Sequence, residues 1–305
     1  MSSARDTVGD LAKLAVTLGL GALTAVMPAA RHASLATWLA AIGNRLRSTG
    51  LDEMATSLHV EFPDETLDAR REIAREMRTV RIEQAMCRGY GVFRRGWPAR
   101  VDVTGAEHLR QAHEEGRGVI LWMMTFLDAT PLNLVASADG HPVPHLSRIG
   151  HGVQGDSPIS LRMVAPILLR GEIRSQARRV IISPSGSLGY LRDLTRVIEQ
   201  QHGTVTIRGD ARSGRRLIEA PFMGGVSSFP TGAPSLAHRS GAPLLTVAVV
   251  HRNPFVHEVV FDEPGPTRRD LGRQAFQVEA VLEFASRLEA RAREHPGSQA
   301  WLRFT

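Results

Sequence analysis

The sequence predicts an α/β fold in which an N-terminal helical region, residues 1–97, precedes a mostly parallel central sheet flanked by helices, residues 98–305. Two observations support this division. Before Pro98, apolar residues recur at helical spacing, as in "LATWLAAIGNRL" and "REIAREMRTVRIEQAMCRGYGVF". After Pro98, short apolar runs alternate with helical segments, which is typical of a sheet built from parallel strands.

The helical region contains one strongly apolar stretch, "LAKLAVTLGLGALTAVMPAA", at residues 11–30. We expect a helix here that packs on the body of the protein, or alternatively lies in a membrane surface. Its uninterrupted part, residues 14–27, is shorter than the roughly 20 residues of a membrane span. The sequence therefore predicts no spanning helix. Farther on, Pro63 and Asp64 mark a break between two helical stretches.

The second region reads as seven strands with helices between them. "VILWMM" is apolar throughout, as expected of a strand that is covered on both faces. The other expected strands are "RVDVTG", "HPVPHLSRI", "TVTIRG", "RLIEA", "APLLTVAVV" and "HEVVFDE". The expected helices are "AEHLRQAHEEGRG", "FLDATPLNLVASADG", "LGYLRDLTRVIEQQHG", "TGAPSLAHRSG" and a long C-terminal helix.

Composition narrows the function classes. The formal net charge is +6, and all basic residues except Lys13 are arginines. This reflects either codon usage that favours arginine or an attraction to anionic partners. Aromatic residues make up 5%, which argues against a stacking platform for single-stranded nucleic acid. The single cysteine, Cys87, excludes an internal disulfide and a cysteine-rich metal site, and we expect it to pack in a helix.

Several common catalytic motifs are missing. The chain has no P-loop lysine motif, no Gly-x-Gly-x-x-Gly after a strand and no His-Glu-x-x-His. The stretch "SGSLG" has Ser185 where a nucleophile elbow has its first glycine. The twelve histidines are scattered without metal-ligand spacing, so we predict no metal and no bound cofactor.

Three blocks of the second region resemble the lysophospholipid acyltransferase superfamily, in particular the bacterial lipid A (lauroyl/myristoyl) acyltransferases. The blocks are "VTGAEHLRQAHEEGRGVILWMMTF", "GTVTIRGDARSGRRLIEAPFMGGVSSFPTGAPSLAHRSGAPLLTVAVV" and the ending "HPGSQAWLRFT". They occur in the family's order and cover roughly residues 100–305. The resemblance implies a glycerolipid acyltransferase-like sheet with a cleft at its strand ends, and it places acyl transfer among the expected activities.

The family's catalytic signature is His-x-x-x-x-Asp/Glu after the "VILWMM" strand, and this chain departs from it. The histidine position holds Thr125 and the carboxylate position holds Thr130, while Phe126 keeps the aromatic neighbour. A threonine hydroxyl cannot replace imidazole as a base, because its pKa lies far from neutrality. Asp128 lies between the two threonines, and His145, His151 and His238 are candidates to approach this place.

Further site residues follow from the same resemblance. We expect substrate-binding residues in the loop between the "TVTIRG" and "RLIEA" strands and after it, across the cleft from Thr125. These candidates are Arg148, Asp210, Arg212, Arg215, Phe222 and Gly232. In the predicted cleft, Thr125, Asp128 and Thr130 face Asp210 and Arg215.

Three functions remain open at this point. The first is an atypical acyl or aminoacyl transfer to an amine-type acceptor, where positioning supplies most of the rate. The second is a catalytically inactive binding protein with this fold, and the third is a lipid A-type lipid acyltransferase. The expected donor is a CoA thioester, an acyl carrier protein or an aminoacyl-tRNA. We expect a cytoplasmic protein, with peripheral contact to an anionic membrane surface as a further interpretation. The sequence leaves the oligomeric state open.

Overall fold

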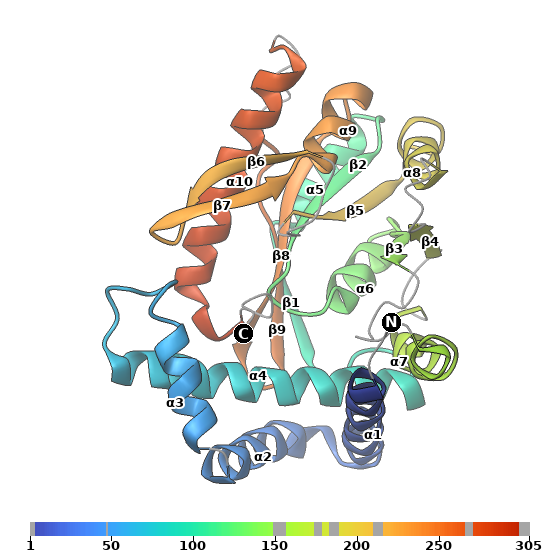
Figure 1. Cartoon of the computed structure of the whole chain (residues 1–305). Helices are drawn as coiled ribbons and strands as arrows, with labels where there is room; N and C mark the ends of the chain where they lie inside the picture. The colour runs from blue at the N-terminus through green and yellow to red at the C-terminus, as the bar shows by residue number, and fades with distance from the viewer. Residues whose placement is uncertain are drawn as a thin grey trace.

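The computed structural model describes residues 4–46, 48–148, 157–173, 179–182, 189–209, 216–265 and 271–298 (Figure 1). The N-terminal helices are α1 (Ala4–Val26), α2 (His32–Leu46), α3 (Ser48–Ser57) and α4 (Leu67–Phe93), with the short 3-10 helix η1 (Ala29–Arg31) before α2. Later helices are α5 (Ala106–Glu114), α6 (Thr130–Ala138), the π-helix η2 (Ser160–Val164), α7 (Ala165–Ile173), α8 (Gly189–Glu199), α9 (Gly232–Ser240), α10 (Arg273–Glu294) and η3 (Pro296–Ser298).

The strands form one central sheet and two small ones. They are β1 (Arg100–Thr104), β2 (Val119–Met124), β3 (His145–Arg148), β4 (Arg179–Ile182), β5 (Thr204–Arg208), β6 (Leu217–Phe222), β7 (Gly225–Pro230), β8 (Leu244–Asn253) and β9 (Val256–Phe261). The central sheet has the order β1-β9-β8-β2-β5. All its pairs are parallel except the β8–β9 hairpin. The predicted α/β class with a mostly parallel sheet and a helical N-terminal region is therefore confirmed.

This topology defines one edge of the sheet that matters for the site. Strands β2, β5 and β8 run in the same direction, so they end at the same edge, which we call the carboxyl edge. Because β8 and β9 are antiparallel and β1 follows β9, the strands β9 and β1 begin there. Open α/β sheets usually bind ligands at the carboxyl ends of their parallel strands.

Two details of the sheet differ from the sequence-based expectation. The predicted "HPVPHLSRI" strand forms as β3, but it pairs with β4 in a separate two-stranded parallel sheet. Strands β4 and β7 were not predicted, and β7 forms an antiparallel hairpin with β6. Three of the six residues of β7 are exposed, and Gly225, Ser227 and Ser228 are small or polar. The segment therefore has no alternating apolar pattern that would predict a strand.

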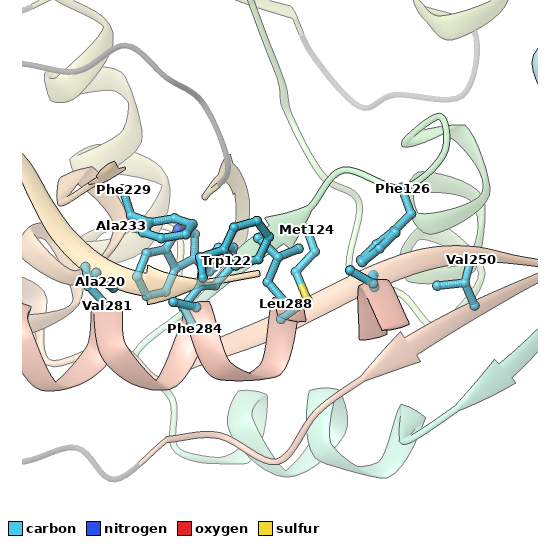
Figure 2. Close-up of a cluster of buried hydrophobic side chains, with 14 of the residues drawn as sticks. Trp122, Met124, Phe126, Ala220, Phe229, Ala233, Val250, Val281, Phe284 and Leu288 are labelled. Carbon is cyan, nitrogen blue, oxygen red and sulfur yellow. The ribbon is translucent and has the colours of Figure 1, made fainter. Parts of the chain in front are cut away.

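Apolar side chains cover both faces of the central sheet. On one face, Trp122 of β2 packs against Phe284 of α10 and Phe229 of the β6–β7 hairpin, and Met124 of β2 lies near Leu288 of α10 (Figure 2). The rings of Trp122 and Phe284 stack with centroids 4.2 Å apart. On the other face, α5 and α6 contribute a second cluster of buried aliphatic side chains. The continuous apolar run of β2 follows from this double coverage.

Helix α4 separates the sheet from the N-terminal helices. It crosses the carboxyl edge, and α1, α2 and α3 all pack against it (Figure 1). Helices α1 and α4 approach closely at Gly21 and Gly89, where a Cβ on Gly21 would lie 2.2 Å from the Gly89 backbone. Buried Asp10 of α1 also accepts a 2.7 Å hydrogen bond from the Ser160 hydroxyl of η2. Helix α1, the N-terminal apolar helix, thus packs on the body of the protein as expected.

The apolar stretch is longer as a helix than the sequence suggested. Residues Asp6–Val26 form 21 continuous helical residues with mean hydropathy 1.4, so by length and composition they could cross a membrane. The prediction counted only residues 14–27, the stretch between Lys13 and Pro28. Neither Lys13 nor Gly19 interrupts the helix, and Gly21 serves the close approach to α4. Only 22% of the most apolar window is buried.

Candidate functional site

Thr125 lies directly after β2, at the carboxyl edge of the sheet. Its side chain is half-buried, whereas Phe126 and Leu127 after it are buried in the two apolar clusters on opposite faces of the sheet. Helix α6 then begins at Thr130. The chain therefore holds Thr125 between the strand and the helix, at the strand end where the family resemblance places a catalytic imidazole.

Asp128 organises the turn between β2 and α6. Its Oδ1 accepts hydrogen bonds from the backbone N–H of Thr130 at 2.9 Å and from the Thr130 hydroxyl at 2.7 Å. Its Oδ2 accepts a bond from Nε of Arg88 on α4 at 2.7 Å. Both carboxylate oxygens are thus bound within the protein, and the Asp128 side chain is 5% exposed.

The charge of Asp128 is stabilised by these partners. Burial alone would raise the pKa of Asp128, but the Arg88 guanidinium and the two bonds from Thr130 outweigh this effect and lower it. A carboxylate with a lowered pKa is a weak base near neutral pH. The geometry therefore favours Asp128 as the anchor of Arg88 and α6 over Asp128 as a proton acceptor.

The remaining predicted site residues lie in different places. Asp210, Arg212 and Arg215 fall outside the described residues, although Gly209 just before them donates its N–H to Met123 O at 2.9 Å. Gly209 therefore lies at the carboxyl edge, beside the end of β2. Arg148 is the last residue of β3 in the small parallel sheet.

Phe222 and Gly232 come from elements on the α10 side of the sheet. Phe222 ends β6 and is buried, with its ring 5.8 Å from that of Phe229. Gly232 begins α9 and is exposed, with no atom within 4 Å of the place where a Cβ would be. Phe126 belongs to the same apolar cluster as Phe222 and is fully buried. These two phenylalanines form part of the core behind the strand end.

A second polar cluster lies at the same edge, one and a half turns earlier on α4. Glu83, with none of its surface exposed, contacts His251 at the end of β8 and His257 at the start of β9. Its Oε2 lies 3.2 Å from Nε2 of His251, and its Oε1 lies 2.6 Å from Nε2 of His257. Both imidazoles at this edge are therefore turned toward a glutamate of α4.

The bonding of His257 fixes its protonation. The indole Nε1 of Trp97 donates to Nδ1 of His257 at 3.0 Å, and an indole N–H can only donate. Nδ1 of His257 is therefore unprotonated, and Nε2 carries the hydrogen that is donated to Glu83. Both ring nitrogens of His257 are engaged, so it holds Glu83 and has no nitrogen available as a base.

Glu83 and His251 form an ion pair. Burial alone would raise the pKa of Glu83, but hydrogen bonds from His251 and His257 lower it to about 2. Burial would likewise lower the pKa of His251, but the carboxylates of Glu76 and Glu83 raise it to about 9. Glu76 Oε1 lies 3.8 Å from Nδ1 of His251, which is too long for a hydrogen bond but close enough for attraction.

Cys87 is placed between the two clusters on α4. It is completely buried, as the sequence led us to expect. Burial raises the pKa of the Cys87 thiol, and the negative charges of Glu83 and Asp128 raise it further. The neutral thiol is a poor nucleophile, so Cys87 is a packing residue at this edge.

A pocket in the described part of the chain lies away from Thr125. It encloses about 520 Å³, part of it open to solvent, between α10 and the first half of β8. Its apolar wall includes Trp122, Leu244, Phe276 and Phe284, and Arg287 lines its polar side. Thr125, Asp128 and Thr130 do not line this pocket. Because Asp210 and Arg215 lie outside the described residues, the cleft expected between them and Thr125 stays a prediction.

Some polar residues at the carboxyl edge were missed by sequence reasoning. They are Glu83, Arg88, His251 and His257. A glutamate on the buried face of the α4 pattern was a usable signal, because a buried charge needs a partner. Its histidine partners lie more than 160 residues away, so nothing local in the sequence pairs them. Of the suggested substitute bases, His238 bonds to Leu271 O at 3.2 Å near the opposite edge, and His151 lies outside the described residues.

Comparison with known proteins adds no family assignment. No family model matches the chain, and no curated protein is significantly similar to it. Among the described residues, no group of three or more histidine, cysteine, aspartate or glutamate side chains is arranged to hold a metal ion.

Proposed function

We propose that this protein is an atypical acyl or aminoacyl transferase that moves an activated acyl group to an amine-type acceptor without a histidine base at the strand end. The observation that carries the proposal is the position of Thr125. It stands half-buried at the end of β2, while His251 and His257 at the same edge are bound to Glu83. The ordered motif resemblance to lipid A acyltransferases supports acyl transfer as the reaction type.

An amine acceptor suits this site better than a hydroxyl. A hydroxyl group has a pKa far above neutrality, so it needs a base as it attacks. An unprotonated amine attacks the ester carbon first and loses its proton to water afterwards. General-base catalysis contributes about 10²–10⁴-fold, so holding both substrates in place compensates for much of its loss.

Each described side chain has a role in this proposal. The Thr125 hydroxyl orients the substrate or donates to the oxygen that becomes negative during attack. The Arg88 guanidinium, 39% exposed and held by Asp128, supplies positive charge at the turn between β2 and α6. Thr130 fixes Asp128. The donor is an activated ester on a carrier: a CoA thioester, an acyl carrier protein or an aminoacyl-tRNA, each of which is anionic and suits a basic protein.

A second candidate function is a binding protein that keeps the fold without turnover. It is favoured by the coverage of the carboxyl edge, where α4 buries Glu83 and both imidazoles. A lipid A-type lipid acyltransferase is the third candidate, favoured by the apolar α1 helix. For all three we propose a cytoplasmic location.

The test offers acyl-CoA, acyl-carrier-protein and aminoacyl-tRNA donors to matched amine and hydroxyl acceptors. We expect turnover with an amine acceptor. Thr125→Val should lower kcat/KM by roughly 5- to 150-fold, the effect of one buried hydrogen bond of about 1–3 kcal/mol. Thr56→Val, on an exposed turn of α3, is the matched control and should retain full activity.

Three other outcomes decide between the candidates. Turnover with hydroxyl acceptors alone would rule out the amine mechanism. Tight binding of one donor without turnover in any combination would establish the binding protein. If Thr125→Val and the wild type have equal kcat/KM, Thr125 has no role in the reaction.

A further inference from the structure

Helix α1 has its polar and apolar faces reversed relative to an ordinary surface helix. The side that packs on the protein carries Asp10, Thr17, Gly21 and Thr24, all buried. Surface helices of soluble proteins normally bury their apolar stripe and expose their polar one. The reversed arrangement in α1 therefore needs a partner for its outward side.

The outward side of α1 is apolar over most of its length. We call its large side chains Val8, Leu11, Val16, Leu23 and Val26 the outer face; they are 39–77% exposed. At 100° per residue these positions lie roughly opposite the buried polar ones. From Val8 to Val26 the outer face extends about 27 Å at 1.5 Å per residue. An exposed apolar surface of this extent marks an interaction site.

Neighbouring elements expose further large apolar side chains and basic side chains. Helix α2 exposes Trp38 by 59%, and η2 exposes Met163 by the same fraction. Among the described side chains of α1, η1 and α2, the exposed basic ones are Lys13, Arg31 and Arg45. Tryptophan and basic residues around an apolar helix face are the features of helices that lie in the interface of an anionic bilayer.

We propose that α1 docks on an anionic lipid bilayer, lying in the plane of its surface with the outer face toward the acyl chains. The layer of α1 and α2 lies on the side of α4 that faces away from the sheet, so a bilayer can reach it without displacing the body (Figure 1). A second copy of this chain would bring a surface with the same positive charges, whereas anionic headgroups would attract them.

The docking of α1 on the body defines the orientation. A helix across the bilayer would have to leave α4, breaking the Asp10–Ser160 hydrogen bond and the Gly21–Gly89 contact. Asp10, buried and bonded here, would then enter hydrocarbon, which is costly for a carboxylate. Lying in the surface keeps both contacts. This inference is independent of the proposed transfer reaction.

The experiment is flotation of the full-length protein with vesicles of phosphatidylglycerol and phosphatidylcholine, compared with pure phosphatidylcholine vesicles. We expect the protein to float with the anionic vesicles and to bind the neutral ones at least ten-fold more weakly. The triple variant Val8→Ser/Val16→Ser/Val26→Ser should bind anionic vesicles at least ten-fold more weakly than the wild type. These three side chains are exposed, so the variant should keep its melting temperature.

The control is Val60→Ser/Val226→Ser, which removes equally exposed valines from the α3–α4 connection and the β6–β7 hairpin. It should float like the wild type. No binding of the wild type to anionic vesicles, or equal binding of the triple variant, overturns the proposal. Resistance to carbonate extraction would show a spanning helix instead. A dimer in light scattering that the triple variant dissociates would show a second copy as the partner.

Discussion

Helices α10 and α1 have nearly the same length, 22 and 23 residues, but they attach to the protein in opposite ways. Helix α10 buries Phe276, Val281 and Phe284 against the sheet. Helix α1 buries Asp10 and Thr17. Burial of apolar area holds α10, whereas close backbone approach and polar bonds hold α1, as in helix pairs within membranes. The difference indicates that the two helices meet different surroundings on their outward sides.

The largest effect should come from the core under α10. Phe284→Ala removes a fully buried ring that stacks on Trp122 and leaves a cavity. We expect a loss of about 3–5 kcal/mol in the free energy of unfolding. Urea denaturation measures it. A loss below 1 kcal/mol would mean that α10 does not depend on apolar burial, and the contrast with α1 would fail.

The second effect concerns the junction of the two regions, where Glu83 of α4 meets His251 of β8. The pKa of His251 is raised from 6.5 to about 9, so its ion pair contributes fully below pH 6.5 and is lost as pH rises through about 9. The upper limit of this loss is about 3 kcal/mol.

Equilibrium unfolding measured between pH 6 and 10 tests this loss. His251→Gln should be less stable at pH 6 but should lack the decline. Since the pKa of Glu83 is lowered from 4.5 to about 2, its contribution is present above pH 4.5 and lost as pH falls through about 2. An unchanged decline in His251→Gln would assign the pH dependence to other groups.

The third effect tests the close approach of α1 and α4. A Cβ on Gly89 would lie 2.1 Å from Thr17 O, so Gly89→Ala should force the helices apart and cost about 1–3 kcal/mol. Gly19→Ala is the matched control, because no atom lies within 4 Å of its Cβ position. It should be neutral or stabilising, by up to about 1 kcal/mol. Thermal unfolding and limited proteolysis of α1 report both changes, and equal stabilities would refute the contact.

The smallest effect is expected on the outer face. Val26 is 77% exposed, so Val26→Ser should change the free energy of unfolding in lipid-free buffer by no more than about 0.5 kcal/mol. Val281→Ser, at a completely buried position of α10, provides the contrast. Chemical denaturation of both variants compares them directly. A large loss for Val26→Ser would show that α1 packs through its outer face after all.

The sheet was predictable from the sequence where a strand is covered on both faces. Strand β2 is predicted by its run of six apolar residues, and all six are buried. The hairpin strand β7 carries no such signal because most of its side chains are solvated. The burial of the polar side of α1 was also unpredictable, because composition shows that a helix is apolar but not which of its sides is buried.

The candidate site was predictable only in its local part. Thr125, Asp128 and Thr130 are neighbours in the chain, and the structure keeps them together. Arg88 joins them from a helix that ends before the first strand. No sequence pattern pairs Arg88 with Asp128, which are 40 residues apart. Their contact depends both on where α4 crosses the sheet and on the direction of β2.

The pairing of the first strand of the sheet with the last has a consequence for biosynthesis. Strand β1 finds its parallel partner only when β9, more than 150 residues later, has left the ribosome. Until the β8–β9 hairpin emerges, Glu83 on α4 has neither of its imidazole partners. The N-terminal helices are therefore synthesised long before Glu83 can be buried against its partners, and its carboxylate stays solvated until residue 257 has been made. The central sheet is therefore completed late in synthesis. Chains truncated before residue 261 should remain substrates for chaperones and proteases.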